Sequence, residues 1–228
     1  MIVRKTIFLI GANPRDFNDI TFGALSNLKK SNCIIISKIF KNNFLKSLKQ
    51  FNIPIIFEEK ISDKKSGQEK LWKKVELLFN NYDCITHIKE NDPIIFNDGI
   101  GEFNYFKKKL KVEFQPGIIN VVSFLNELKL SLTDRRLNST VYFYDFINKK
   151  LNFNFCSLGF ERIILRVSKN IDYKKLFKKL DKYKLNYEIS IIFFENNLFL
   201  NMFDKNFYEK IKFYLRKKNN FLIIFSKK

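Results

Sequence analysis

Short apolar runs alternate with segments of helical periodicity through the first half of the chain. The runs are too short for helices and are followed by turn residues, so they predict buried strands. These strands are Thr6–Ile10, Cys33–Ile36, Ile53–Phe57, Cys84–Ile88 and Val112–Phe114. Between them, apolar side chains recur every three or four residues and predict helices over 21–30, 68–79 and 101–110. This alternation favours a mostly parallel sheet covered by helices.

The second half of the chain has a different pattern. After a helix predicted over 121–128, strands become denser, and amphipathic helices are predicted over 172–184 and 205–217. The predicted strands are 140–146, 161–167, 188–194, 198–203 and 221–226. A Pro116-Gly117 turn separates the two halves. The fold class expected is therefore α/β, with an N-terminal α/β domain over 1–115 (mostly parallel sheet) and a C-terminal α/β domain over 116–228 (mixed sheet).

Charge adds a question about partners. The chain has 228 residues and a formal net charge of +19. An acidic partner, such as nucleic acid, an anionic membrane or a polyanionic small molecule, is one explanation. Composition is the other, and we favour it, because 35 of the 42 basic residues are Lys and Lys, Asn, Ile and Phe dominate the chain. The lysines are dispersed and Arg is rare, so we expect no nucleic-acid footprint.

The cysteines and the apolar runs give no sign of a metal site or a membrane span. Three cysteines lie far apart without a CxxC pair, which predicts neither a metal site nor a disulfide framework. The apolar stretch near the start ends at Ile10, too short for a span and without a cleavage site. We therefore expect a cytoplasmic protein without a metal, a membrane partner or a nucleic-acid partner.

Three loops that follow predicted strands are candidates for ligand binding. They are 10–16, 91–101 and 115–118, at the carboxyl ends of strands, where open α/β sheets bind ligands. Each is also an ordinary Gly/Pro turn when taken alone. The adjacent Arg135 and Arg136 can clamp carboxylates or form a solvated surface. The only histidine, His87, has no nucleophile or carboxylate motif nearby in sequence, which favours a structural or surface role.

Six segments are more informative through their order than through any one motif. They are GANPRD with Ile20-Thr21, Gly67–Glu69, KENDPIIFNDGIGE (89–102), VEFQPGI (112–118), LTDR (132–135) and Glu195–Asn197. In this order they resemble the tetrapyrrole methylase family, and within it the uroporphyrinogen-III C-methyltransferases. The corresponding segments of that family read GAGPGD…LT, PQE, KGGDPFIFGRGGEE, FEVVPGI, LTHR and Glu-Asn-Ala/Gly.

The resemblance implies two α/β domains with a cleft between them, usually in a homodimer. It implies transfer of methyl groups from the cofactor S-adenosylmethionine to uroporphyrinogen III, which gives precorrin-2 for sirohaem or cobalamin. The sulfonium is already activated, so alignment and exclusion of water matter most, and a base then removes a proton from the alkylated ring. A cationic cleft would help to bind a substrate that bears eight carboxylates.

Residue by residue, the resemblance assigns cofactor contacts to Pro14, Glu90, Asn91, Asp92, Ile95, Ile119, Asn120, Val167 and Asn197. It assigns substrate contacts to Lys38 and Arg135 and a catalytic role to Lys60.

Several of these positions depart from the family pattern. Glu90 and Asn91 replace two glycines, and a positive φ would strain a Glu more than an Asn. Ser37 stands at the usual position of a catalytic Asp, and Asp98 replaces an Arg. Two alternatives follow. One is a catalytically impaired relative that keeps the fold as a binding or scaffold protein, and the other is a related methylase acting on RNA or protein.

Overall fold

The computed structural model divides into two compact units, residues 1–123 and 124–228. The structure describes residues 5–58, 65–95, 97–127, 129, 131–133, 141–146, 162–167, 176, 178, 180–182, 187–193, 198–201 and 221–227. The sequence places the boundary at 115/116. The first unit continues a few residues further and includes Ile119 and Asn120.

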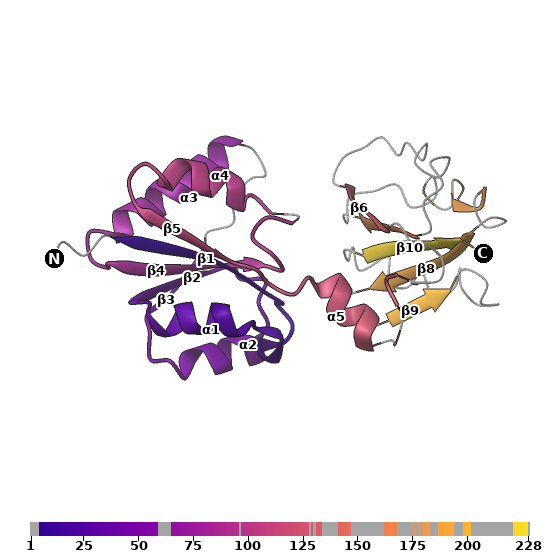
Figure 1. Ribbon diagram of the computed structural model, residues 1–228, viewed down its shortest axis with the longest axis horizontal. Helices are drawn as coiled ribbons and strands as arrows, with labels where there is room; N and C mark the ends of the chain where they lie inside the picture. The colour runs from indigo at the N-terminus through magenta and orange to yellow at the C-terminus, as the bar shows by residue number, and fades with distance from the viewer. Residues whose placement is uncertain are drawn as a thin grey trace. The chain divides into compact units, whose positions relative to one another are not determined.

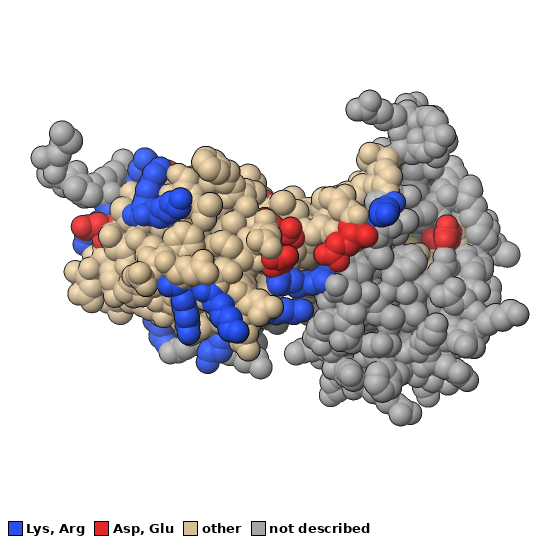
Figure 2. Space-filling model, turned by 90° about the horizontal axis from the view of Figure 1, so that it is seen from below, with Lys and Arg blue, Asp and Glu red and all other residues tan. Residues whose placement is uncertain are grey.

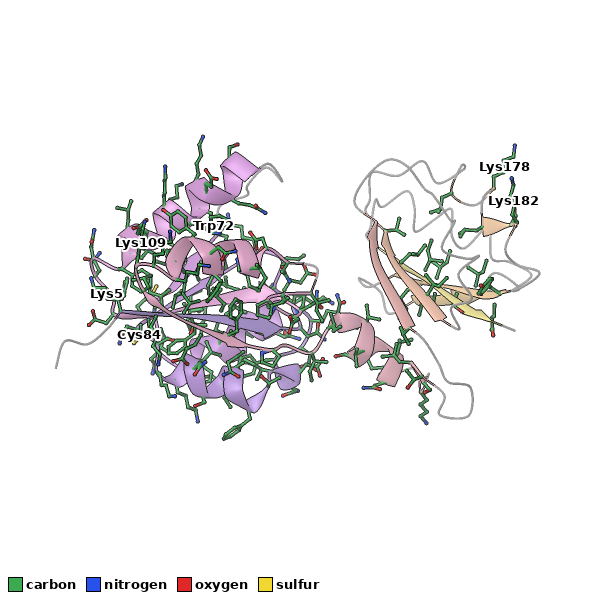
Figure 3. All side chains as sticks on the ribbon, turned by 45° about the horizontal axis from the view of Figure 1, so that its top comes forward. Lys5, Trp72, Cys84, Lys109, Lys178 and Lys182 are labelled. Atoms are coloured by element: carbon green, nitrogen blue, oxygen red, sulfur yellow. The ribbon has the colours of Figure 1, made fainter. Side chains whose placement is uncertain are left out.

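A five-stranded parallel sheet forms the centre of the first unit (Figure 1). Its strands are β1 (Thr6–Ala12), β2 (Cys33–Ile36), β3 (Ile55–Phe57), β4 (Cys84–Glu90) and β5 (Lys111–Gln115). The order across the sheet is β3-β2-β4-β1-β5, with Thr6 opposite Cys84 and Ala12 opposite Glu90. The expected parallel sheet is thus confirmed. Lys5 and Cys84 mark the amino end of the sheet in Figure 3, and the ends that follow Ala12 and Glu90 lie opposite.

Helices cover both faces of this sheet, which explains why β1 and β2 carry continuous apolar runs rather than alternating apolar and polar residues. A short 3-10 turn, η1 (Phe17–Asp19), leads into α1 (Phe22–Lys29), which packs with α2 (Asn42–Lys49) on one face. On the other face lie α3 (Lys65–Leu78) and α4 (Gly99–Phe106). All seven residues of β1 are buried. Phe8 and Ile10 contact the α1/α2 layer, whereas Ile7 and Leu9 contact the layer that contains Trp72.

The sequence analysis did not identify α2. Its apolar positions, Phe44, Leu45 and Leu48, are few, and lysines and asparagines surround them. Phe44 and Leu48 are nevertheless completely buried, because α2 packs on the sheet and on the rings of Phe17 and Phe40. Tertiary packing, more than intrinsic propensity, usually stabilises a helix this short.

The second unit contains a mixed sheet, as expected. Its strands are β6 (Val141–Phe146), β7 (Arg162–Val167), β8 (Tyr187–Phe193), β9 (Leu198–Asn201) and β10 (Phe221–Lys227). Their order is β6-β7-β10-β8-β9, parallel between β6 and β7 and antiparallel elsewhere. Helix α5 (Asn120–Glu127) links the units in sequence. Of the helix expected over 172–184, Leu176, Lys178 and Leu180 are described and helical, and the helix expected over 205–217 lies outside the described residues.

The surface carries charges in separate groups. On the face of the first unit seen in Figure 2, Lys and Arg side chains form several groups with uncharged surface between them. None of the helices in the described part of the chain is both long and apolar enough to cross a bilayer. Within the same residues, no group of three or more His, Cys, Asp or Glu side chains is arranged to hold a metal ion.

Candidate functional site

The carboxyl ends of β1, β4 and β5 meet at one point of the first unit. The backbone N–H of Asn91 donates to the carbonyl of Ala12 over 2.7 Å, which joins the ends of β4 and β1. Gly11 and Gly117 lie directly against each other there. A Cβ added to Gly11 would lie 2.1 Å from the Asn91 carbonyl oxygen, and one added to Gly117 would lie 1.9 Å from it. Both positions therefore require glycine for space, and three backbone segments come together where open sheets bind ligands.

Asn91 adopts a left-handed conformation, with φ of 64°. Its side-chain Oδ1 accepts a 2.6 Å hydrogen bond from the backbone N–H of Asn120, the first residue of α5. Asn tolerates positive φ better than most residues. Glu90 is not among the described non-glycine residues with positive φ, because it still pairs with Ala12 as the last residue of β4. The strain considered for Glu90 is therefore absent, and the positive φ falls on the more tolerant residue.

Asp92 organises the loop that follows. Its Oδ1 accepts from the backbone N–H groups of Ile94 (2.8 Å) and Ile95 (3.1 Å), and its Oδ2 accepts from that of Gly117 (3.3 Å). The Asn97 side chain donates to the carbonyls of Glu90 (2.5 Å) and Asp92 (2.7 Å). The Asp92 carboxylate is therefore occupied in holding the loop, and Ile95, 41% exposed, presents an apolar surface beside it.

Pro14 lies on the adjacent loop after β1. It is buried, and its carbonyl accepts from the backbone N–H of Lys41 over 3.0 Å, which ties this loop to the one after β2. The loop after β2 contains Ser37, partly buried, and Lys38, exposed. A hydroxyl in place of a carboxylate leaves Ser37 without a group that can serve as a base at neutral pH.

The first unit thus brings together most of the residues assigned to the cofactor, and the rest are placed as follows. Asn91, Asp92 and Asn120 are linked by hydrogen bonds through the Gly117 turn, and Ile119 begins the turn into α5, where its carbonyl accepts from Val122 over 2.8 Å. Val167 is buried in β7 of the second unit. Lys60, Arg135 and Asn197 lie outside the described residues. The cleft between the units remains a prediction.

A buried network of charged residues lies next to the loop after β4. The sequence did not predict it. His87, completely buried in β4, contacts two carboxylates: Nδ1 lies 2.6 Å from Glu102 of α4, and Nε2 lies 2.5 Å from Glu58, just after β3. Lys89 lies 2.6 Å from the second oxygen of Glu102 and 3.5 Å from Asp98. The prediction of a surface role for His87 is therefore wrong. The alternative, a structural role, agrees with its contacts to two acids from other elements.

The pKa values within this network shift to favour charged groups. Burial alone would lower the pKa of His87, but Glu102 and Glu58 outweigh burial and the charge of Lys89, so the pKa lies above its usual range. Burial opposes ionisation of Glu102 as well, yet His87 and Lys89 lower its pKa to about 2. Burial likewise acts against the charge of Glu58, whose pKa is lowered by His87. The pKa of Lys89 is raised, because the attraction of its three neighbouring carboxylates outweighs the cost of burial.

One signal in the sequence pointed to this network. Side chains alternate between faces along a strand, so His87 and Lys89 point to the same side of the sheet as Ile85. That side is covered by α3 and α4, with Trp72 above it (Figure 3). Two cationic side chains in a covered strand require acidic partners, because unpaired buried charges are very costly. The pattern could have predicted that acids exist nearby, but not which ones.

Comparisons with known proteins give the chain its relatives. No family model matches it. The curated uroporphyrinogen-III C-methyltransferase of Cyanidium caldarium is 26% identical over 182 residues, covering 76% of this chain and 69% of that protein. The protein of the same name from Saccharomyces cerevisiae is 34% identical over 107 residues, which is 44% of this chain and only 17% of that protein.

Solved structures agree over nearly the whole chain. A cobalt precorrin-4 methyltransferase matches with a TM-score of 0.75 and 13% identity, covering 97% of this chain and 95% of that one. A uroporphyrin-III C-methyltransferase from Thermus thermophilus matches with a TM-score of 0.72 and 15% identity, covering 98% and 94%. The same enzyme complexed with S-adenosyl homocysteine gives 0.66 and 15%, covering 96% of each chain.

The resemblance found in the six sequence segments is therefore confirmed. The relatives and structural neighbours are methyltransferases, which is the enzyme class expected from those segments, and one neighbour holds the demethylated form of the expected cofactor. At these identities the structural matches establish the fold, and the curated matches establish the similarity in sequence. In sequence this chain is thus similar to curated uroporphyrinogen-III C-methyltransferases, and in fold it is similar to solved tetrapyrrole methyltransferases.

Proposed function

We propose that this chain is an S-adenosylmethionine-dependent methyltransferase that methylates uroporphyrinogen III to precorrin-2, in the sirohaem and cobalamin branch. The observation that carries the proposal is the junction of Asn91, Asp92, Gly117 and Asn120 at the carboxyl ends of β1, β4 and β5. Four residues assigned from the resemblance, Asn91, Asp92, Ile119 and Asn120, come from two distant segments and meet at this junction. Such a meeting is expected of a shared binding site and not of unrelated turns.

The residues at this junction fit the cofactor. Glycines at 11 and 117 allow backbone segments to approach where a Cβ would collide. Ile94, Ile95 and Ile118 are 52%, 41% and 37% exposed at the same edge of the sheet, which suits the apolar parts of an adenosyl group. Polar side chains there, Asn91 and Asp92, are used to hold backbone, so recognition depends on backbone groups and apolar contact.

The cofactor supplies a methyl group on an activated sulfonium. The chain must hold the reacting atoms in line and exclude water, and the loop after β4, which Asp92 and Asn97 hold by hydrogen bonds, suits that purpose. Lys38 offers an exposed cation for substrate carboxylates, with Arg135 proposed for the same role. Lys60 is the proposed catalytic residue, since Ser37 carries no carboxylate. Pro14, Val167 and Asn197 complete the proposed cofactor contacts.

The charge reversal at Asp98 is less harmful than the sequence suggested. Asp98 is 27% exposed in its side chain and lies 3.5 Å from the ammonium of Lys89, which is 6% exposed. Lys89 therefore neutralises part of the negative charge that would repel a polyanionic substrate. The position still lacks a cation to attract one, so we expect substrate affinity to be weakened more than cofactor affinity.

Two measurements test the proposal. Calorimetry with S-adenosylhomocysteine should detect binding, and a precorrin-2 assay with uroporphyrinogen III should detect turnover below that of a typical relative, because losing a positioned acid or base costs about 10²–10⁴-fold. We also propose a homodimer, which light scattering would detect. No binding at millimolar concentration would contradict the function as an enzyme. Binding without any turnover would favour the alternative, a catalytically impaired relative that acts as a binding or scaffold protein.

A further inference from the structure

The charged network next to the candidate site connects β4, α4 and the end of β3. His87 touches one acid from the end of β3 and one from α4, so a single ring joins three elements of the sheet layer. Lys89, two residues along the same strand, joins Glu102 to Asp98, which directly precedes α4. These contacts lie immediately before and after the loop from Glu90 to Asp98.

The conformation of the loop depends on where it joins α4. Asn97 holds it to Glu90 and Asp92, and the backbone N–H of Gly99 donates to the carbonyl of Pro93 over 3.0 Å. A Cβ at Gly99 would lie 2.2 Å from that same carbonyl oxygen, so α4 begins in close contact with the loop. Any shift of α4 away from β4 would therefore displace the residues assigned to the cofactor.

The two close carboxylates determine whether the His87 ring carries one N–H proton or two. A neutral imidazole has one N–H and one lone pair, so it can donate to only one of the two acids. With Nδ1 and Nε2 at 2.6 and 2.5 Å from carboxylate oxygens, only the doubly protonated ring donates to both. The charged groups that face it are Glu58, Glu102, Lys89 and, through Lys89, Asp98.

We propose that His87 is a positioning residue of this site: as an imidazolium it clamps Glu58 to Glu102, and with Lys89 it fixes the start of α4 and the loop from Glu90 to Asp98. The inference rests on the proposed function for the identity of the ligand, S-adenosylmethionine. The clamp itself rests on the contacts of the described residues alone. It acts through the loop and does not touch the cofactor.

The two contacts of the clamp differ in strength. Glu102 is completely buried and is also held by Lys89, whereas the Glu58 side chain is 18% exposed and can be hydrated. When His87 loses its proton, the remaining N–H stays on Nδ1, toward Glu102, and the contact between Nε2 and Glu58 is lost. Deprotonation thus leaves only Lys89, 4.0 Å away, to hold Glu58 against β4, and it loosens the base of the loop.

Because His87 is the only histidine, its protonation can be followed directly. We expect nitrogen-15 NMR of the imidazole to show both nitrogens protonated at pH 6.5 and the Nδ1–H tautomer at higher pH. Glu58→Gln should move this transition to lower pH, because one of the two stabilising negative charges is gone. Glu76→Gln is the matched control, since Glu76 also has two side-chain partners, Tyr105 and Lys109, but lies on the exposed surface between α3 and α4.

The functional consequence is measured by binding and by backbone exchange. Across the His87 transition, the Kd for S-adenosylhomocysteine should rise about tenfold, the equivalent of one lost charge-assisted hydrogen bond. Glu58→Gln should show the weaker affinity already at pH 6.5, and Glu76→Gln should behave as the wild type does. Amide exchange at Ile94, Ile95 and Gly99, corrected for its intrinsic pH dependence, should accelerate with loss of the clamp.

The His87 clamp and the proposed function are tested by different results. If the protein binds no S-adenosylhomocysteine at any pH, the proposed function fails, while the NMR titration and the amide exchange still test the clamp. A His87 transition at or below its ordinary pKa of 6.5, or one that Glu58→Gln leaves unchanged, would overturn the clamp. Unchanged affinity and unchanged exchange in Glu58→Gln would overturn its positioning role.

Discussion

Replacement of Gly117 by alanine tests the junction on which the candidate site depends. The new Cβ would lie 1.9 Å from the Asn91 carbonyl oxygen and 2.5 and 2.6 Å from the carbonyl carbon and Cα of Gly11. All three are backbone atoms at the ends of other strands, so no side-chain rotation relieves the overlap. The strand ends must separate by roughly 1.5 Å to restore normal contact distances.

That separation also breaks hydrogen bonds. The bond from Gly117 N–H to Asp92 is 3.3 Å long, and the one from Asn120 N–H to Asn91 is 2.6 Å. Overpacking costs about 1–3 kcal/mol, and each lost bond adds about 1 kcal/mol. We therefore expect Gly117→Ala to reduce the free energy of unfolding by about 3–5 kcal/mol, a fall in Tm of roughly 10 °C, and to abolish measurable S-adenosylhomocysteine binding.

The assay is thermal unfolding by circular dichroism, followed by calorimetry on the folded variant. Gly101→Ala is the matched control, because its Cβ would meet only Trp72 ring atoms, at 3.0 and 3.2 Å. Alanine is favoured over glycine inside a helix such as α4 by about 1 kcal/mol, which offsets this tight contact. A Gly117→Ala variant that melts within about 2 °C of the wild type would refute the close approach of the three strand ends.

Four further predictions concern the loop after β4, the buried charges and the lysines of the surface. Asn91→Ala should destabilise by about 2 kcal/mol in urea unfolding, from the strain of positive φ and the lost bond to Asn120, whereas Asn91→Gly should cost about half as much; equal losses would contradict the backbone geometry. The folded pKa of His87 is raised, so its stabilisation should be complete below pH 6.5 and lost as pH rises through that raised value, and His87→Gln should abolish this slope in urea titrations. Glu102 acts in the opposite direction, with stabilisation present above pH 4.5 and lost as pH falls towards 2. Binding to duplex DNA or RNA should be weak at 150 mM salt in a filter-binding assay, and tight, steeply salt-dependent binding would show that the lysines form a nucleic-acid surface after all.

The pattern of apolar and polar residues was enough to predict the outline of the fold. Runs such as Thr6–Ile10 are uniformly apolar because helices cover both faces of a parallel sheet, and Gly11 marks the end of the run. The order of the six segments identified the relatives, although no single motif was specific. It also predicted that the loops after β1, β4 and β5 matter, since the carboxyl ends of parallel strands share one edge of a sheet.

The contacts that hold those loops come from tertiary packing and could not be predicted. The Asn91-Asp92-Pro93 turn was visible in sequence, but strand pairing with Ala12 keeps Glu90 extended and moves the positive φ to Asn91. The helix α2 was missed because its apolar stripe is short, and the sheet supplies the surface that buries Phe44 and Leu48. The roles of His87 and Asp98 likewise depend on acids and lysines distant in sequence. Charge pairing acts through space over a few ångströms, and which charges come that close is set by the packing of β3, β4 and α4 rather than by their spacing along the chain.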